Sequence, residues 1–325
     1  MTPLLDVRDL IVEFPTRHGV LRALDRISFS IAPGEILGVV GESGAGKSLT
    51  GVAIVGLLTP PGRIAGGSVY LDGARIDNLP AEPLRRIRGR RIGMIFQDPL
   101  TTLNPLLRIG RQLTETMRTH LDLNEAAARR RAIEWLERVG IPDAPRRIDA
   151  WPHEFSGGQR QRVVIALALC AGPELVIADE PTTALDVSVQ AQIITLLKTL
   201  TRENGTSVML VTHDMGVIAE TADRVAVMYA GRIAEIGPVA SVIRHPGHPY
   251  TDGLMGSIPT TGHRAERLRQ IDGSMPRLDA IPSGCAFHPR CARAFDRCLI
   301  EQPGLLDAGA TQAACWLHAM ETVRG

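Results

Sequence analysis

Lysine is nearly absent from this chain. Of its 36 basic residues, only Lys47 and Lys198 are lysines, and the other 34 are arginines. Acidic residues number 35, so the formal net charge is +1 and no overall attraction to nucleic acid or acidic lipid is expected. Aromatic residues make up only 4% of the chain, which disfavours the base-stacking surfaces of single-strand-binding proteins. We therefore expect no nucleic-acid partner.

Long apolar segments are missing as well. The longest obvious apolar run, residues 163–172, is about half of the roughly 18 residues that suggest a membrane-spanning helix. At the N-terminus, Asp6, Arg8 and Asp9 interrupt the apolar core that a signal peptide would need. We expect a cytoplasmic protein that reaches a membrane only through a partner.

The chain does contain the alternation of strands and helices that is typical of an α/β domain. Strands are predicted where β-branched, aromatic or other apolar residues cluster, at 10–14, 27–31, 36–40, 175–178, 208–212 and 224–229. A glycine-rich loop follows the strand 36–40, and an apolar helix is predicted from about residue 47 to 58. This order of strand, loop and helix indicates the start of an α/β domain.

Two stretches depart from this pattern. Residues 98–154 have helical periodicity and predict a small helical insertion, whose second helix has Asn124 as N-cap and Gly140 as C-cap. Beyond about residue 236 the chain is rich in Pro, Gly and His, which predicts a separate C-terminal module. Arginine runs at 85–91 and 129–131 are interpreted as solvated faces, with contact to lipid headgroups or a membrane partner as the alternative.

The segment Gly41-Glu-Ser-Gly-Ala-Gly-Lys-Ser48 has the spacing of a phosphate-binding loop. Its glycines let several backbone N–H groups converge on phosphate oxygens, and the following helix adds its positive N-terminal dipole. In this motif Lys47 contacts the β- and γ-phosphates and the Ser48 hydroxyl binds Mg²⁺.

A second acidic element ends the predicted buried strand at 175–178. Asp179 is positioned to hold the hydration shell of Mg²⁺, and Glu180 to polarise an attacking water. Together with the phosphate loop, the pair predicts a nucleotide hydrolase.

Four further segments resemble motifs of the ABC ATPase family. Phe155-Ser-Gly-Gly-Gln-Arg-Gln-Arg162 resembles the signature motif, although Phe155 replaces the commoner leucine. Gln97 in Phe96-Gln-Asp-Pro resembles the Q-loop glutamine, and His213 in Val211-Thr-His-Asp214 the switch histidine. Ala184-Leu-Asp186 resembles the D-loop, with Thr183 in place of the commoner serine before it. The resemblance covers residues 1 to about 237, with every motif in the family's order.

This resemblance implies a site shared by two subunits that sandwich two ATP molecules. Ser156 is a natural helix N-cap, and Gly157 and Gly158 expose N–H groups that suit an anion, here the γ-phosphate held by the other subunit. The implied catalytic residues are Glu180, His213, Gln97 and Lys47. The implied nucleotide-binding residues are Phe14, Gly41, Ser43, Gly44, Ala45, Gly46, Lys47, Ser48, Leu49, Gln97, Asp179, Ser156, Gly157, Gly158 and Gln159. Mg²⁺ would be held by Ser48, Gln97 and Asp179. Phe14 would stack on adenine, with core packing as its rival role.

A finer resemblance is to the D-type ATPase of bacterial dipeptide and oligopeptide importers. It rests on Ile177-Ala-Asp-Glu-Pro-Thr-Thr-Ala-Leu-Asp-Val187, His248-Pro-Tyr-Thr251 and Gly284-Cys-x-x-His-Pro-Arg-Cys291. It implies a complex of two different ATPases, two membrane permeases and an external solute-binding protein, with this chain at the cytoplasmic face of the inner membrane. The helical insertion and the Gln97 region would receive a permease coupling helix. Importers of this class take peptides, nickel or other metal chelates, and some other small solutes.

Five cysteines are unevenly placed. Cys170 lies alone in an apolar segment and is predicted to be an inert core thiol. Cys285, Cys291, Cys298 and Cys315 fall close together, which in a reducing cytosol favours a metal or cluster site over disulfides. Four thiolates suit either Zn²⁺ or a [4Fe–4S] cluster. Resemblance to D-type ATPases that carry an iron–sulfur cluster favours [4Fe–4S], with a structural or redox-sensing role.

The expected fold is therefore an α/β ABC-type nucleotide-binding domain. It consists of a RecA-like core, an antiparallel β-subdomain and a helical insertion, over residues 1–237. The helical subdomain would span 98–154 and the signature motif 155–160, and the Cys-rich C-terminal module 238–325. The predicted function is to hydrolyse ATP and power an importer, most simply of di- or oligopeptides. A soluble ABC ATPase that acts on DNA or ribosomes is the competing class, but such proteins usually carry two cassettes or a long coiled-coil insertion.

Overall fold

The computed structural model describes residues 2–182, 186–257 and 270–319. The chain folds into two compact units, each assembled from separate stretches of sequence. The first unit comprises Met1–Leu5, Ile31–Glu35 and Asp72–Val211, and the second Asp6–Ser30, Ile36–Leu71 and Thr212–Gly325. Each unit is described separately below.

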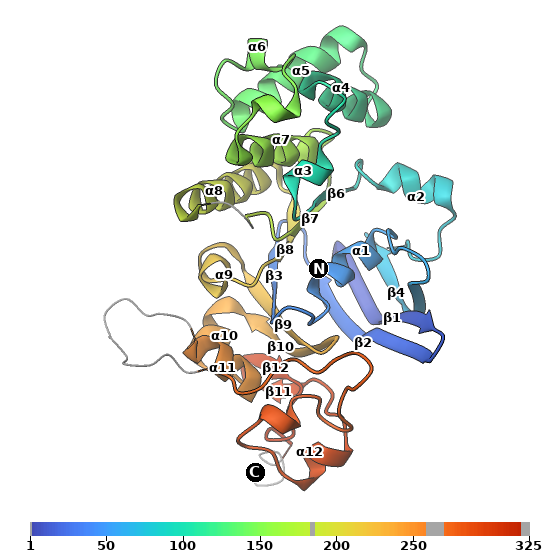
Figure 1. Cartoon of the computed structure of the whole chain (residues 1–325), viewed down its shortest axis with the longest axis vertical. Coiled ribbons are helices and arrows are strands. Elements are labelled where there is room, and N and C mark those ends of the chain that lie inside the picture. The colour runs from blue at the N-terminus through green and yellow to red at the C-terminus, as the bar shows by residue number, and fades with distance from the viewer. Residues whose placement is uncertain (1, 183–185, 258–269, 320–325) are drawn as a thin grey trace. The chain divides into compact units, whose positions relative to one another are not determined.

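The first unit contains three parallel strands in the order β6-β7-β8 (Figure 1). They are β6 (Ile92–Ile95), β7 (Leu175–Asp179) and β8 (Ser207–Val211), and a short β5 (Ala74–Arg75) also belongs to this unit. Every residue of β7 and β8 is buried. Parallel strands that are covered on both faces consist of nearly continuous apolar runs, which is why these two strands could be predicted. The predicted strands at 175–178 and 208–212 are confirmed to within one residue at each end.

Helices make up the rest of the first unit. They are α2 (Ala81–Ile87), α3 (Pro99–Thr102), α4 (Ile109–His120), α5 (Glu125–Arg138), α6 (Ala144–Arg147), the 3-10 turn η1 (Pro152–Glu154), α7 (Gly157–Leu169) and α8 (Val187–Asn204). The elements within the predicted helical stretch 98–154 are thus all helices or helical turns. As predicted, the side chain of Asn124 caps α5 by accepting the Ala127 N–H at 2.9 Å. Gly140 follows α5 with a φ of 76°, the left-handed conformation that ends many helices.

The second unit contains two groups of strands. The first has the order β2-β1-β4, in which β1 (Leu5–Thr16) and β2 (Gly19–Ile31) form an antiparallel hairpin beside β4 (Arg63–Leu71). In the second group β3 (Ile36–Val40) runs parallel to β9 (Arg224–Tyr229). From β9 the group continues through antiparallel pairs to β10 (Arg232–Pro238), β12 (Thr311–Ala313) and β11 (Leu306–Ala308). The strands predicted at 10–14 and 27–31 therefore exist and are longer than expected, and the strand predicted at 36–40 has the expected bounds.

The helices of the second unit are short: α1 (Lys47–Ile54), α9 (Met215–Thr221), α10 (Val239–Arg244), α11 (Pro249–Gly256), the 3-10 turn η2 (His288–Arg290) and α12 (Asp296–Ile300). Helix α1 ends four residues before the expected Leu58, because Gly56 adopts a φ of 68° and its N–H bonds back to the Ala53 carbonyl. In the described part of the chain, no helix combines the length and apolar character that would let it span a bilayer.

Candidate active site

The phosphate loop connects β3 to α1 within the second unit, as its motif requires. Gly46 precedes α1 with a φ of 102°, and Gly44 has a φ of 84°. A side chain at Gly41 would bring its Cβ to 2.3 Å from the Met228 carbonyl oxygen, so only glycine fits against β9 there. The Ala45 carbonyl accepts the Gly231 N–H at 3.0 Å and fastens the middle of the loop to the β9–β10 turn. The loop thus turns tightly and packs against β9 and the β9–β10 turn.

Lys47 occupies the centre of this loop. The residue is only 6% exposed, and Nζ donates to the carbonyl oxygens of Gly41 at 2.8 Å and Glu42 at 3.1 Å. Ser43 and Gly44 are exposed, whereas Ser48 and Leu49 at the start of α1 are partly buried. The ammonium group therefore spans the loop where phosphate oxygens would be held in a motif of this kind.

The acidic pair lies in the first unit, at the end of β7. Asp179 is buried, and Glu180 has a φ of 44°, a left-handed conformation that is rare for a non-glycine residue. The Glu180 N–H donates to the Val211 carbonyl at 2.9 Å, which anchors this conformation to β8. Gln97 Nε2 donates to Glu180 Oε2 at 3.1 Å. The structure therefore brings two predicted catalytic residues into direct contact, although they are 83 positions apart.

Ser156 caps helix α7 as predicted. Its Oγ accepts the Gln159 N–H at 3.3 Å, and Gln159 Oε1 accepts the Ser156 N–H at 3.1 Å. This reciprocal capping box gives Gln159 a capping role that was not predicted, although the S-x-x-Q spacing signals it. Gly157 and Gly158 form the first turn of α7, and a Cβ on Gly158 would lie 2.8 Å from Val189 Cγ1. The helix thus starts with a fixed, glycine-lined N-terminus that suits an anion.

His213 lies in the second unit, immediately before the N-cap of α9. It lines one cavity together with Val40, Gly41, Glu42, Asp214 and Met215. His213, the predicted switch histidine, and the start of the phosphate loop therefore line the same cavity.

The remaining predicted residues have mixed outcomes. Phe14 is partly exposed on β1. Its ring also packs closely against Gly62, since a Cβ on that glycine would lie 2.7 Å from Phe14 Cε1. Stacking on adenine stays a prediction. Thr183, Ala184 and Leu185, including most of the predicted D-loop, lie outside the described residues.

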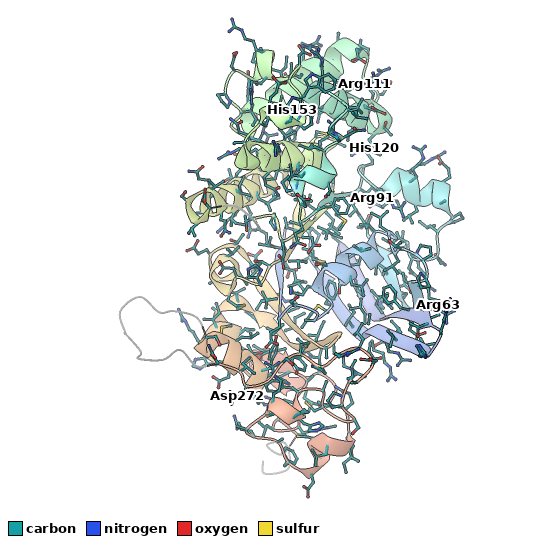
Figure 2. All side chains as sticks on the ribbon, viewed as in Figure 1. Arg63, Arg91, Arg111, His120, His153 and Asp272 are labelled. Carbon is teal, nitrogen blue, oxygen red and sulfur yellow. The ribbon has the colours of Figure 1, made fainter. Side chains whose placement is uncertain are left out.

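Most arginines of the two basic runs have acidic or carbonyl partners. Arg91, labelled in Figure 2, donates to both carboxylate oxygens of Glu174 at 2.8 and 2.6 Å. Arg85 and Arg86 both donate to Glu82, and this pairing lowers the pKa of Glu82 to about 2. These contacts agree with the interpretation of the runs as solvated, paired surface.

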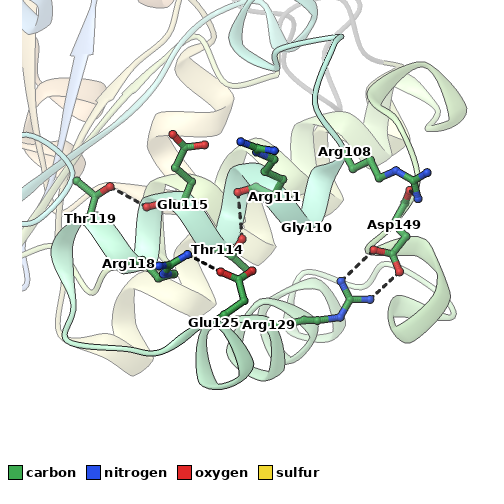
Figure 3. A pocket seen from close by; sticks show the side chains of 10 residues that line it. All are labelled: Arg108, Gly110, Arg111, Thr114, Glu115, Arg118, Thr119, Glu125, Arg129 and Asp149. Atoms are coloured by element: carbon green, nitrogen blue, oxygen red, sulfur yellow. Dashed lines mark hydrogen bonds and ion pairs between the residues drawn. The ribbon is translucent and has the colours of Figure 1, made fainter.

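A charged cavity opens between α4 and α5 of the helical subdomain (Figure 3). On its rim Arg129 makes a two-bond contact with Asp149, at 2.9 and 2.6 Å, and Arg118 pairs with Glu125 at 2.5 Å. Arg108 lies over the ring of Trp151 at 5.4 Å. Two of the four arginines that line the cavity pair with carboxylates, so the cavity is polar and its charges are partly matched.

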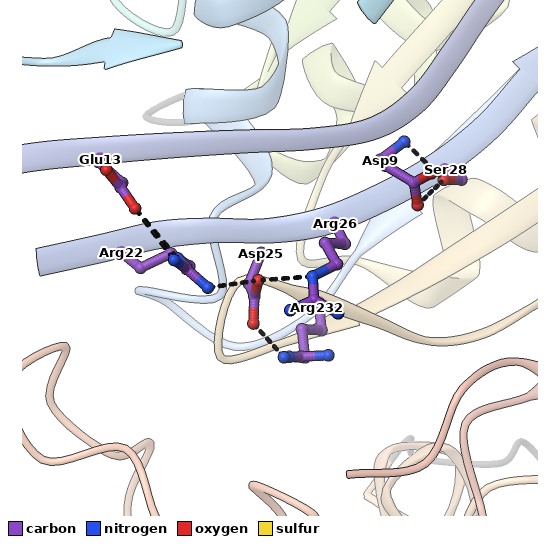
Figure 4. Close-up of polar contacts among 7 residues, drawn as sticks. All are labelled: Asp9, Glu13, Arg22, Asp25, Arg26, Ser28 and Arg232. Carbon is purple, nitrogen blue, oxygen red and sulfur yellow. Dashed lines mark hydrogen bonds and ion pairs between the residues drawn. The ribbon is translucent and has the colours of Figure 1, made fainter. Parts of the chain in front are cut away.

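A second charged network joins β2 to β10 within the second unit (Figure 4). Asp25 forms ion pairs with Arg22, Arg26 and Arg232. Burial lowers the pKa of Arg232 although Asp25 opposes the shift. Nearby, Asp9 adopts a φ of 46° and exchanges hydrogen bonds with Ser28 at 2.8 and 3.2 Å. The network fixes the middle of β2 beside the β9–β10 turn that holds Ala45.

The four C-terminal cysteines line one small cavity together with His248, Phe287 and Trp316. Burial raises the pKa of the Cys285 thiol to about 11, and it also raises the pKa of Cys291 and Cys315. Backbone groups of Phe287, Arg293 and Leu317, each two residues further along the chain, oppose these shifts. Among the described residues, however, no three His, Cys, Asp or Glu side chains are arranged as ligands of one metal ion. The four cysteines therefore lie around one cavity, but their arrangement does not support the expected [4Fe–4S] cluster with a ligand geometry.

Solved structures similar to this chain define its class. It matches the dimeric ATP-binding cassette MJ0796, bound to ADP and Pi, with a TM-score of 0.65 and 30% identity over 72% of this chain and 98% of that one. It also matches cbiO1 from Clostridium perfringens, part of the ABC transporter complex cbiONQ, with a TM-score of 0.64 and 29% identity over 75% and 92% of the two chains. Fold and site motifs together thus define an ABC-type ATPase, and the expected α/β fold with an antiparallel sheet is confirmed.

Sequence relatives place the chain more closely. Residues 24–183 match the ABC transporter family, and residues 234–298 match the C-terminal region of oligopeptide/dipeptide transporters. The oligopeptide transport ATP-binding protein OppD of Haemophilus influenzae is 47% identical over 98% of both chains. OppD of Escherichia coli is 48% identical over 92% of this chain and 89% of its own, and a putative peptide import ATP-binding protein of Brucella abortus is 49% identical over 96% and 94%. The chain belongs to the ABC transporter family, among the ATP-binding proteins of its oligopeptide/dipeptide class, and it is an ATPase.

Proposed function

We propose that this chain hydrolyses ATP to power the import of di- or oligopeptides. One observation carries the proposal: a complete set of ABC motifs and the oligopeptide/dipeptide C-terminal region occur on one chain. The OppD and Brucella relatives are oligopeptide transport and peptide import ATP-binding proteins, and they match over nearly their whole length. The chain would act as a peripheral subunit at the cytoplasmic face of the inner membrane.

Each site residue then has a defined role in hydrolysis. Lys47 and the N–H groups of the phosphate loop would bind the β- and γ-phosphates, while Ser48, Asp179 and Gln97 would hold Mg²⁺. Glu180 orients and deprotonates the attacking water, and His213 contacts the γ-phosphate. The contact between Gln97 and Glu180 supports a link between the metal and the general base, because it joins the two side chains at 3.1 Å. Ser156 and the glycines of α7 would bind the γ-phosphate held by the partner ATPase.

The implied assembly contains a second homologous ATPase, two permeases and a solute-binding protein outside the membrane. The dimeric state of the matched cassette MJ0796 supports an ATP sandwich. The residue range 98–154 with Gln97 would form the docking region for a permease coupling helix. We place the boundary between the ATPase domain and the C-terminal module near residue 237, which agrees with a second family match that begins at 234.

The test measures ATP-driven uptake of a labelled peptide by the complete transporter in proteoliposomes. Wild-type complex should accumulate a labelled tripeptide only when MgATP is supplied on the side of this chain. The complex with Glu180→Gln should bind ATP with normal affinity but lose uptake and turnover together. Uptake of a nickel chelate in place of every peptide tested would overturn the peptide assignment while leaving the importer assignment intact.

For the cysteine cavity, we propose a soft metal centre, with [4Fe–4S] favoured and Zn²⁺ as the alternative. Support comes from the shared location of Cys285, Cys291, Cys298 and Cys315, which line one cavity, because four thiol donors suit a soft metal. When bound, such a centre would supply structural cross-linking or one-electron chemistry. Protein purified without oxygen should contain four iron and four sulfide per chain by the stoichiometry of the cluster. A colourless protein with stoichiometric zinc would contradict the cluster.

A further inference from the structure

Glu42, the first variable residue of the phosphate loop, is held by all three of its polar groups. Its backbone N–H donates to the Tyr250 hydroxyl at 2.9 Å, and its carbonyl oxygen accepts from Lys47 Nζ at 3.1 Å. Its carboxylate accepts two hydrogen bonds from the guanidinium of Arg290, at 2.9 and 3.1 Å. Two of the three partners come from residues more than 200 positions away, in the C-terminal part of the chain.

Arg290 is itself fixed in place. Its side chain is only 8% exposed, whereas that of Glu42 is 27% exposed. Arg290 Nε donates to the Asp272 carbonyl at 2.8 Å, and Nη1 lies 3.4 Å from the Tyr229 hydroxyl. A two-bond arginine–carboxylate pair that is shielded from water and held from behind fixes orientation as well as distance. The pair is therefore less exposed to solvent than the two-bond pairs Arg91–Glu174 and Arg129–Asp149.

An aromatic cluster supports both partners of Glu42. The ring centroids of Tyr229 and Tyr250 are 4.7 Å apart, and that of Phe287 lies 5.2 Å from Tyr229 and 5.4 Å from Tyr250. Phe287 belongs to the segment that begins at Cys285 and ends at Arg290 and Cys291. A continuous set of contacts therefore runs from the cysteine cavity, through the rings and Arg290, to the start of the phosphate loop.

This arrangement has a consequence for ATP binding. The loop contains Gly44 and Gly46 in left-handed conformations, and a glycine-rich segment loses much conformational freedom when it closes around phosphates. Fixing Glu42 at three points orders the loop entrance before the ligand arrives, and preorganisation of this kind raises affinity. Fixing Glu42 also fixes its carbonyl oxygen, which accepts a hydrogen bond from Lys47 Nζ.

We propose that Arg290 and Tyr250 are positioning residues of the ATP site, so that the C-terminal region preorganises the phosphate loop for MgATP. The inference rests on the ATPase activity of the family and adds residues that lie outside its nucleotide motifs. The competing explanation is that the same contacts only attach the C-terminal region to the loop. The two explanations differ in what happens to nucleotide affinity when the pair is broken in a folded protein.

The test measures binding of Mg²⁺ and the non-hydrolysable analogue AMP-PNP to the full chain by calorimetry, with thermal melting in parallel. Arg290→Gln and Glu42→Gln should each weaken binding about tenfold, and the double variant should bind no more weakly than either single one, because both remove one interaction. Glu42→Gln breaks the Arg290–Glu42 pair through a change in the phosphate loop, so the segment that carries the cysteines is left unchanged. Tyr250→Phe keeps the ring and should weaken binding about threefold by leaving the Glu42 N–H unpaired.

Arg277→Gln is the matched control. Arg277 pairs with Asp279 at 3.1 Å in the same C-terminal region, with a side chain that is 83% exposed, and it should leave AMP-PNP binding unchanged. Unchanged affinity in folded Glu42→Gln and Arg290→Gln, with a lowered melting temperature, would overturn the proposal and leave only attachment. Failure of the wild-type chain itself to bind AMP-PNP would instead contradict the ATP site.

Discussion

The two lysines of the chain occupy different surroundings. Lys47 is buried among loop carbonyls at 2.8 and 3.1 Å, where a compact ammonium group fits and a planar guanidinium does not. Lys198 lies partly exposed on α8, next to the buried Leu197. A chain that otherwise uses arginine therefore keeps one lysine at the position where the motif predicts contact with phosphates.

Replacing each lysine by arginine should show which of the two is needed for ATP turnover. We expect Lys47→Arg to lower ATP turnover on the order of 100-fold or more, because the group that spans the β- and γ-phosphates no longer fits the loop. Lys198→Arg serves as the control and should be silent. Steady-state phosphate release measures turnover, and circular dichroism confirms the fold. Turnover of Lys47→Arg near that of wild type would refute the role of Lys47.

Cys170 should behave as an inert thiol. It is fully buried at the end of α7, and burial raises its pKa to about 12 from an ordinary value of 9.0. Because the folded-state pKa is the higher one, the related contribution to stability is complete below pH 9 and is lost as the pH rises toward 12. At about pH 8, below the ordinary thiol pKa, iodoacetamide should leave Cys170 unmodified in the native protein and modify it after unfolding in urea. Mass spectrometry of peptides provides the measurement, and rapid native labelling of Cys170 would contradict the prediction.

At the scale of elements, local signals predicted several helix ends correctly. Asn124 and Ser156 cap α5 and α7 because a short side-chain oxygen satisfies an N–H that the helix leaves unpaired. Helix α1 ends earlier than predicted, at Ile54. Gly56 was a local signal for this end, but the apolar run 47–58 obscured it. By contrast, the contact of Gln97 with Glu180 and that of Arg290 with Glu42 join distant segments. No local pattern specifies such pairs, since they depend on how the whole chain folds.

The capping box of α7 gives a prediction at this scale. Ser156→Ala removes the acceptor of the Gln159 N–H and should destabilise the protein by about 1 kcal/mol, which urea denaturation measures. The N-terminus of α7 would then be less well fixed, so ATP turnover of the transporter should fall more than stability alone explains. Ser156→Thr retains the hydroxyl acceptor and should recover most of both. Equal stability of wild type and Ser156→Ala would show that the cap is not formed.

At the scale of the whole molecule, the C-terminal region takes part in the second unit's main group of strands. Strand β12 pairs with β10 through Glu235 opposite Ala313 and Ile236 opposite Gln312. Glu235 is fully buried, and its carboxylate accepts hydrogen bonds from Gly247 and His248 N–H groups and from the Thr311 hydroxyl, at 2.8 to 3.0 Å. The sequence indicated a change of composition near residue 237, but composition does not reveal that later strands return to pair with earlier ones.

Deleting residues 280–325 should therefore destabilise the remaining chain and not merely remove an appendage. The deletion takes away β11, β12 and the Thr311 hydroxyl, so it uncovers the edge of β10 and leaves a buried carboxylate without one of its donors. We expect poor solubility or a melting temperature lowered by several degrees. Thr311→Val is the milder matched variant, since it removes only the hydroxyl and should cost about 1–3 kcal/mol in the free energy of unfolding. If the truncated chain melts like the intact one and binds AMP-PNP with the same affinity, the C-terminal region is an independent module, and its contacts with β10 and with the phosphate loop contribute nothing to either property.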